Sequence, residues 1–114
     1  MSIEVRPDQV AACVALWELL GFEKVMPPAM LRDRFTWVER AGTQIHLIPL
    51  DDPVTPTQGH AAVVVDDYDA TLQRLHERGF VTHPGSNAWG APRSFVRDPA
   101  GNRIELMSKP PPTR

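Results

Sequence analysis

The hydrophobic positions of the chain change their spacing in a regular order. Ile3 and Val5 alternate with polar residues, which predicts a strand over residues 2–6. Apolar side chains recur at helical spacing after Pro7, and Gly21 follows them, so the pattern predicts a helix that ends at this glycine. Three more strands are predicted at about residues 22–26, 34–39 and 44–48, the last ended by Pro49 because proline cannot donate to a sheet.

The second half of the chain repeats this order. The stretch HAAVVVD predicts a strand, residues 67–78 predict a helix, and Gly79 follows. FVTH, RSFVRD and NRIELM predict the remaining strands, with DPAGN as a tight turn between the last two. Four residues of the first half recur 58 positions later: Val5, Asp8, Gly21 and Phe22 match Val63, Asp66, Gly79 and Phe80.

This repetition predicts an α+β protein built from two βαβββ modules. Module 1 is expected at about residues 1–50 and module 2 at about residues 60–108, joined by a linker at 51–59. The tail, 109–114, contains three prolines and is expected to be disordered. A chain of 114 residues suits one domain with a substantial core.

Composition narrows the range of partners. The formal net charge is -2 and the basic residues are scattered, so a nucleic-acid partner is not expected. No apolar run approaches the roughly 20 residues that a membrane span needs, and the N-terminus shows no signal-peptide pattern. We therefore expect a cytoplasmic protein. Cys13 has no second cysteine to pair with and lies in an apolar helical pattern, so it is expected in the core.

Two histidines and a glutamate interrupt the strands. In QIHLI, Ile45 and Leu47 share one face while His46 lies on the other, and in NRIELM Glu105 lies opposite its apolar neighbours. His60 opens the first strand of the second half. Two imidazoles and a carboxylate bind Zn, Ni, Mn, Fe or Co and leave positions open for a substrate. The alternative is that all three are solvated strand residues.

The second half resembles the vicinal oxygen chelate superfamily, which includes glyoxalases, bleomycin-resistance proteins and extradiol dioxygenases. The resemblance rests on GHAAVVVDDYDATLQRLHERGF and WGAPRSFVRDPAGNRIELM, and more weakly on PDQVAACVALWELLGF and GTQIHL in the first half. It implies a curved mixed sheet with a cleft, and metal ligands on the first and last strands of each module. Carried over, His46, His60 and Glu105 would be metal ligands, with Glu105 also catalytic. The fourth ligand position falls on Ser2 or Met1, which are poor ligands.

The resemblance leaves two main functions open. The first is a divalent-metal enzyme of lyase, isomerase or dioxygenase type that acts on a small molecule with adjacent oxygens. The second is a metal-free protein that binds a small molecule or antibiotic, as bleomycin-resistance proteins do. In either case a homodimer is implied. A non-catalytic interaction module is a third possibility without distinctive support. The expected substrate-binding residues are Trp37, Trp89, Phe95 and Arg93, with Arg97 as an alternative partner for an anionic group.

Overall fold

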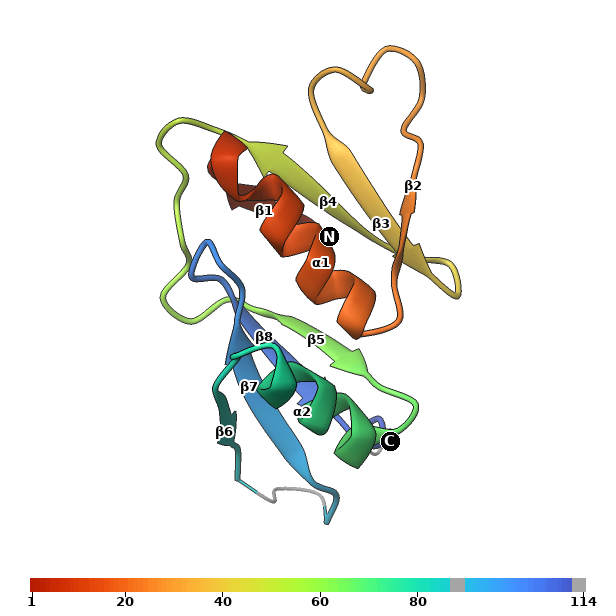
Figure 1. Cartoon of the computed structure of the whole chain (residues 1–114), viewed down its shortest axis with the longest axis vertical. Helices are drawn as coiled ribbons and strands as arrows, with labels where there is room; N and C mark the ends of the chain where they lie inside the picture. Colours follow the sequence, from red (N-terminus) through yellow and green to blue (C-terminus); the bar gives the residue numbers. More distant parts are fainter. Residues whose placement is uncertain (87–89, 112–114) are drawn as a thin grey trace.

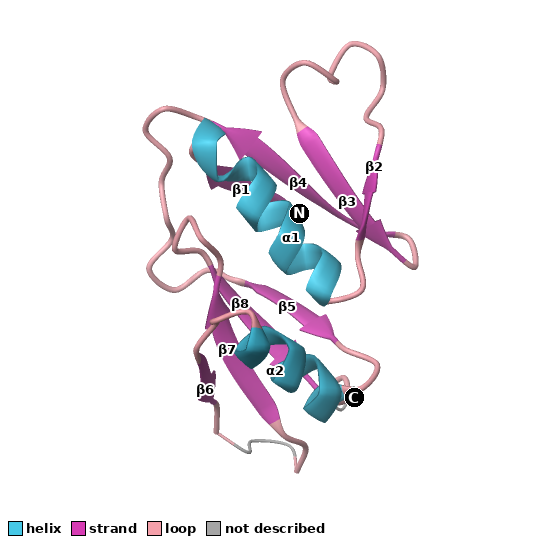
Figure 2. Ribbon diagram, viewed as in Figure 1, coloured by secondary structure: helices cyan, strands magenta, loops and turns pink. Residues whose placement is uncertain are grey.

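The computed structural model describes residues 1–86 and 90–111, and it contains the two predicted modules in order (Figure 2). The first module consists of β1 (Ser2–Val5), the short 3-10 turn η1 (Pro7–Gln9), α1 (Val10–Leu19), β2 (Glu23–Val25), β3 (Thr36–Arg40) and β4 (Thr43–Pro49). The second consists of β5 (Ala61–Val64), α2 (Tyr68–Glu77), β6 (Thr82–Pro84), β7 (Arg93–Arg97) and β8 (Arg103–Met107). The βαβββ order and the α+β class are confirmed.

Each module forms its own four-stranded mixed sheet. The strand orders are β1-β4-β3-β2 and β5-β8-β7-β6, with the first pair of each sheet parallel and the other pairs antiparallel. In Figure 1, α1 lies in front of the first sheet and α2 in front of the second, so both helices cover the same side of the molecule. The opposite face of each sheet carries no helix.

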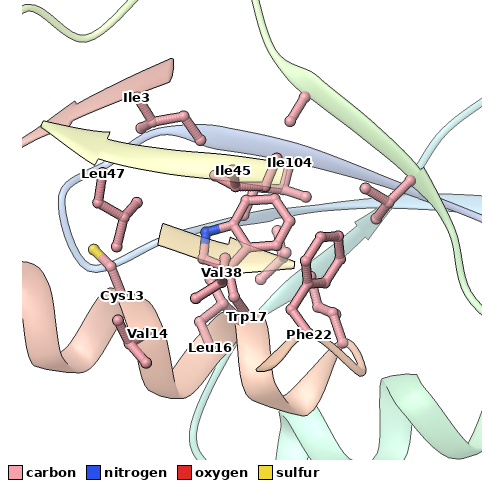
Figure 3. Close-up of a cluster of buried hydrophobic side chains, with 14 of the residues drawn as sticks. Ile3, Cys13, Val14, Leu16, Trp17, Phe22, Val38, Ile45, Leu47 and Ile104 are labelled. Carbon is pink, nitrogen blue, oxygen red and sulfur yellow. The ribbon is translucent and has the colours of Figure 1, made fainter. Parts of the chain in front are cut away.

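The core lies between the helices and the sheets and joins the two modules. Figure 3 shows Trp17 and Leu16 of α1 beside Ile45 of β4, with Ile104 of the second module close by. Trp17 and Phe22 pack edge to face, with ring centroids 4.9 Å apart. Each of the buried aliphatic side chains contributes about 1.5–3 kcal/mol to folding by leaving water. Cys13 belongs to this cluster, as expected.

Polar contacts also connect the modules. The Asn102 side chain donates to the carbonyl oxygen of Glu4 at 3.1 Å, which attaches the turn before β8 to β1. Arg40 donates to the carbonyl oxygen of Val64 at 2.9 Å and pairs with Asp66 at 2.8 Å. These contacts fix the position of one sheet relative to the other.

Helix starts and strand ends depart slightly from the sequence-based expectations. The first helix begins only at Val10, because Pro7 opens a 3-10 turn. In the second module, Asp67 caps α2 by accepting from the backbone N–H of Ala70 at 3.1 Å. Pro49 ends its strand as expected, but it is itself part of β4, which therefore extends one residue beyond the predicted end at residue 48. Pro49 is the last residue of β4, where it needs no donor because it lies at the end of the ladder opposite Val5.

In the described part of the chain, neither helix is long and apolar enough to cross a membrane. Residues 112–114 of the tail lie outside the described residues, so its disorder stays a prediction.

Candidate functional site

The predicted site residues lie on the face of the sheets that carries no helix. On β4, Ile45 and Leu47 are buried toward α1, so strand alternation turns His46 to the other face. On β8, Ile104 and Leu106 are buried toward α2, and Glu105 is turned the other way in the same manner. Glu105 is nevertheless only 6% exposed, because neighbouring side chains on the open face cover it.

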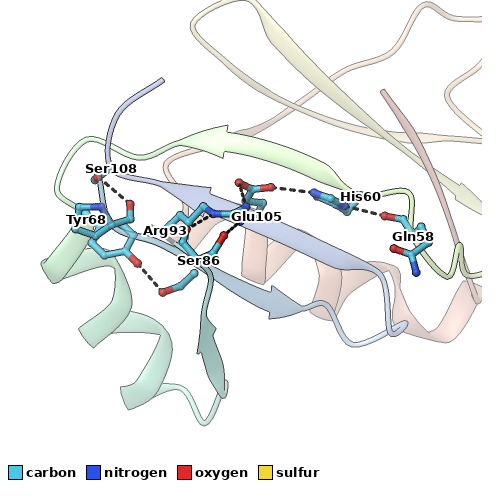
Figure 4. A network of polar contacts seen from close by, with 9 residues as sticks. Gln58, His60, Tyr68, Ser86, Arg93, Glu105 and Ser108 are labelled. Carbon is cyan, nitrogen blue, oxygen red and sulfur yellow. Dashed lines mark hydrogen bonds and ion pairs between the residues drawn. The ribbon is translucent and has the colours of Figure 1, made fainter. Parts of the chain in front are cut away.

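Three residues from separate strands and loops form one polar network around Glu105. His60 Nε2 lies 2.9 Å from Glu105 Oε1, and Arg93 Nη1 lies 2.9 Å from Glu105 Oε2. Figure 4 shows the carboxylate between the Arg93 and His60 side chains. Arg93 is held in place by Ser86, because its Nε and Nη2 donate at 2.8 Å to the carbonyl and hydroxyl oxygens of that residue. Both carboxylate oxygens are therefore already occupied.

This network keeps the Glu105 carboxylate ionised. Burial raises the pKa of Glu105, but the hydrogen bonds and charges of His60 and Arg93 outweigh burial and lower the pKa below its usual value. The other ring nitrogen of His60, Nδ1, lies 2.8 Å from the carbonyl oxygen of Gln58, which can only accept. The two ring nitrogens of His60 therefore each face an oxygen acceptor, the Glu105 carboxylate on one side and the Gln58 carbonyl on the other.

His46 lies in a separate environment on the first sheet. Its ring stacks on Trp37, its cross-strand partner on β3, with centroids 3.9 Å apart and planes inclined by 7°. Gln44 donates through Nε2 to Glu39 at 2.8 Å, so the amide oxygen of Gln44 faces His46 Nε2 at 3.0 Å and that nitrogen donates. Burial and the nearby N-terminal ammonium lower the pKa of His46.

The three predicted metal ligands are therefore only partly brought together. His60 and Glu105 meet, but among the described residues no group of three His, Cys, Asp or Glu side chains is placed to hold a metal ion. Two features oppose a metal at the His60–Glu105 pair: the Arg93 guanidinium occupies one carboxylate oxygen, and both ring nitrogens of His60 already face oxygen acceptors. In a single chain, these residues do not fit the divalent ion that the resemblance implies.

The strand register shows which residues of the two modules correspond to each other. His46 pairs with Ser2 on β1, and Glu105 pairs with Ala62 on β5. Ser2 therefore corresponds to Ala62, and not to His60 as the 58-residue repeat suggests.

The expected substrate-binding residues divide between the two sheets. Trp37 contributes to a cavity of about 120 Å³ on the first sheet, together with His46, Phe35 and Leu31. Phe95 and Arg93 line a cavity of about 470 Å³ on the second sheet, as does Arg97. Trp89 lies outside the described residues.

Sequence reasoning missed Arg103, which also lines the cavity of about 470 Å³ on the second sheet. Its guanidinium carbon lies 3.8 Å from the Phe95 ring centroid. The signal was present, since Arg103 shares a strand face with Glu105 two positions later.

Comparison with known proteins identifies the family of this two-module fold. A sequence model of the Glyoxalase/Bleomycin resistance protein/Dioxygenase superfamily matches residues 4–106. The chain belongs to this superfamily. The superfamily contains enzymes, among them a lyase and oxidases, as well as proteins that are not enzymes, and many members depend on a metal. No curated protein sequence matches the chain.

Solved structures share the fold over almost the whole chain. A glyoxalase family protein from Bacillus anthracis is 26% identical, with a TM-score of 0.81 over 93% of this chain and 88% of that one. A lactoylglutathione lyase from Agrobacterium tumefaciens is 20% identical, with a TM-score of 0.67 over 94% and 90% of the two chains. A bleomycin resistance determinant encoded on the transposon Tn5 is 17% identical, with a TM-score of 0.65 and 96% coverage of both chains. The last two likenesses concern the fold alone.

Proposed function

We propose that this superfamily member is a small-molecule-binding protein that takes its ligand on the helix-free face without a resident metal ion. One observation carries the proposal: both carboxylate oxygens of Glu105 are engaged, one by His60 and one by Arg93. The negative charge that a divalent ion would need is already neutralised by side chains of the protein itself.

Metal binding at this place would require two costly changes. Arg93 would have to leave the carboxylate, and its guanidinium would give up a charge-assisted hydrogen bond in a mostly buried setting. His60 would have to give up one of the two oxygen acceptors that its ring nitrogens now face. A divalent ion beside the Arg93 guanidinium would also experience direct charge repulsion.

The surface available to an organic ligand is partly aromatic. The stacked Trp37 and His46 rings form one wall of the smaller cavity, and Phe95 with Arg93 forms part of the larger one. Aromatic walls with a few placed polar groups are typical of small-molecule sites. We extend the proposal to Trp89 as a ligand contact and to a homodimer as the working assembly, as in many members of the superfamily.

The proposal is tested by ligand screening of untagged protein treated with a chelator. Thermal unfolding is measured with metal-free bleomycin, catechol and benzoate, first without metal and then after adding Zn, Ni, Mn, Fe or Co. Stabilisation of the metal-free protein by at least one compound, weakened by Trp37→Ala, supports the proposal. The matched control is Gln73→Ala on the exposed side of α2, which should bind as the wild type does. Stabilisation that appears only after a metal is restored contradicts it.

A metal-dependent enzyme is the second candidate, favoured by one feature of His60. Its Nδ1 donates to the backbone carbonyl of Gln58, which is the orientation that metal-binding histidines commonly have. In this alternative, His46 of a second copy would complete the ligand set with His60 and Glu105, and Glu105 would act in catalysis. Elemental analysis of metal in the purified protein separates the two candidates.

A further inference from the structure

Two arginines face each other across the last two strands of the second sheet. Arg97 of β7 and Arg103 of β8 are register partners in an antiparallel pair, so their side chains emerge side by side on the helix-free face. Like charges directly opposite each other destabilise a sheet. Within the described part of the chain, neither arginine forms an ion pair. The pair therefore costs stability that no carboxylate of the described residues recovers.

The immediate contacts of both side chains leave much of their hydrogen-bonding capacity unused. Arg97 donates through Nη1 to the carbonyl oxygen of Gly101 at 2.9 Å. Arg103 lies over the Phe95 ring, with its guanidinium carbon 3.8 Å from the ring centroid, and makes no other polar contact among the described residues. A guanidinium has five N–H donors, so both groups can still bind an oxyanion in the bidentate manner.

The two arginines border the cavity of about 470 Å³. Its lining contains Arg93 and His83 as well, and no aspartate or glutamate. The charge of Arg93 is already balanced by Glu105. The charges of Arg97 and Arg103 are left without an acidic partner in the wall of the cavity.

The cavity also has an apolar side of fixed shape. Both guanidiniums lie near the Phe95 ring, with the carbon of Arg103 at 3.8 Å and that of Arg93 at 5.3 Å from the ring centroid. Gly85 allows the β6–β7 connection to approach this ring, because a Cβ atom at Gly85 would lie 2.9 Å from Phe95 Cε2. The result is a cationic pocket beside an immobilised aromatic ring.

We propose that this pocket binds a small organic anion. Its carboxylate or phosphate group would lie between Arg97 and Arg103, and its apolar part would pack toward Phe95 and Gly85. Binding would replace the repulsion between the two guanidiniums with two charge-assisted contacts. The inference rests on the proposed function, because it names the class of ligand that the helix-free face takes.

The test uses chelator-treated protein at low salt and follows binding by calorimetry and by NMR shifts. The probes are benzoate, acetate and inorganic phosphate, which separate the oxyanion from the apolar part. For a ligand as small as benzoate, a dissociation constant of about 1 mM is expected. Acetate should bind more weakly, and tighter binding of phosphate than of benzoate would identify the head group as a phosphate.

Arg97→Gln and Arg103→Gln should each weaken the preferred probe by about tenfold or more, because each removes a charged hydrogen-bond donor pair. Arg78→Gln, an exposed arginine at the end of α2, is the matched control and should leave binding unchanged. Thermal unfolding of each variant confirms that it is folded. Should a variant unfold, the wild-type NMR shifts decide: probe-induced shifts confined to residues 83–86, 93–97 and 103 support the inference.

Two outcomes overturn the inference: no binding of any probe up to about 10 mM, or binding that both glutamine variants retain. Another organic compound stabilising the chelator-treated protein would in that case leave the proposed function standing. If ligands stabilise the protein only after a metal is added, the proposed function is overturned, whether or not the anionic probes bind.

Discussion

The Arg93–Glu105 ion pair should be a measurable source of stability. Arg93 side-chain exposure is 17% and that of Glu105 is 8%, so solvent screens the pair only weakly. Replacing Arg93 by Met keeps most of the apolar stem and removes the charge. The carboxylate then keeps one partner, His60, and loses the other.

The size of the effect follows from what remains of the network. Removing one partner of a buried ion pair typically costs about 3–5 kcal/mol when the other charge is left unpaired. A hydrogen bond to a charged group is worth about 1.5–3 kcal/mol, and His60 still compensates Glu105, so the smaller range applies. Arg93→Met also removes the hydrogen bonds with Ser86. The loss of stability in this single variant is therefore larger than the contribution of the Arg93–Glu105 ion pair alone.

A double-mutant cycle isolates the interaction. Urea unfolding at pH 7 gives the free energies of unfolding of the wild type, Arg93→Met, Glu105→Gln and the double variant. We expect a coupling energy of about 1.5–2 kcal/mol between the two positions. A coupling energy below about 0.5 kcal/mol would refute the reasoning, because Glu105 would then be available to other partners, a metal ion among them.

Three other properties should follow from the same structure. Because the pKa of Glu105 is lowered from 4.5, the ionised carboxylate stabilises the fold above that pH, and this contribution is lost as the pH falls. When the free energy of unfolding is measured against pH, Glu105→Gln should lose less stability in acid than the wild type. Equal losses in the two proteins would contradict this prediction. Burial is the main cause that raises the pKa of the Cys13 thiol to about 12, so a disulfide reagent at pH 8 should react with Cys13 only after the protein unfolds. Rapid reaction of the native protein would contradict the buried position of this thiol. Gly85→Ala should destabilise by about 1–3 kcal/mol through the contact with Phe95, whereas Gly59→Ala, with 3.5 Å to its nearest neighbour, should be close to neutral in urea unfolding.

The fold could be predicted because each module repeats the same local signals. Glycines after both helices, alternating strands and the DPAGN turn all specify the same order of elements, and all of these elements are present. The relation between the modules was harder to predict. The Asn102–Glu4 and Arg40–Val64 contacts join residues far apart in the chain, and no local sequence pattern predicts them.

The site could be predicted only as far as strand faces. Alternation correctly turned His46 and Glu105 away from the helices. It could not show which side chains meet, because that depends on register and on loops. The register places Trp37 beside His46, and the loop around Ser86 delivers Arg93 to Glu105. A carboxylate that looked available for a metal in the sequence is occupied by an arginine in the structure.

The most direct test of the account is the metal content of untagged wild-type protein, measured by elemental mass spectrometry together with thermal unfolding in the presence of Zn, Ni, Mn, Fe and Co. With Glu105 held by Arg93 and His60, we predict substoichiometric metal and no stabilisation by any of the five ions. Near-stoichiometric content of one metal, with stabilisation by that ion that disappears in Glu105→Gln, would contradict the account. It would make the metal-dependent enzyme the better description of this protein.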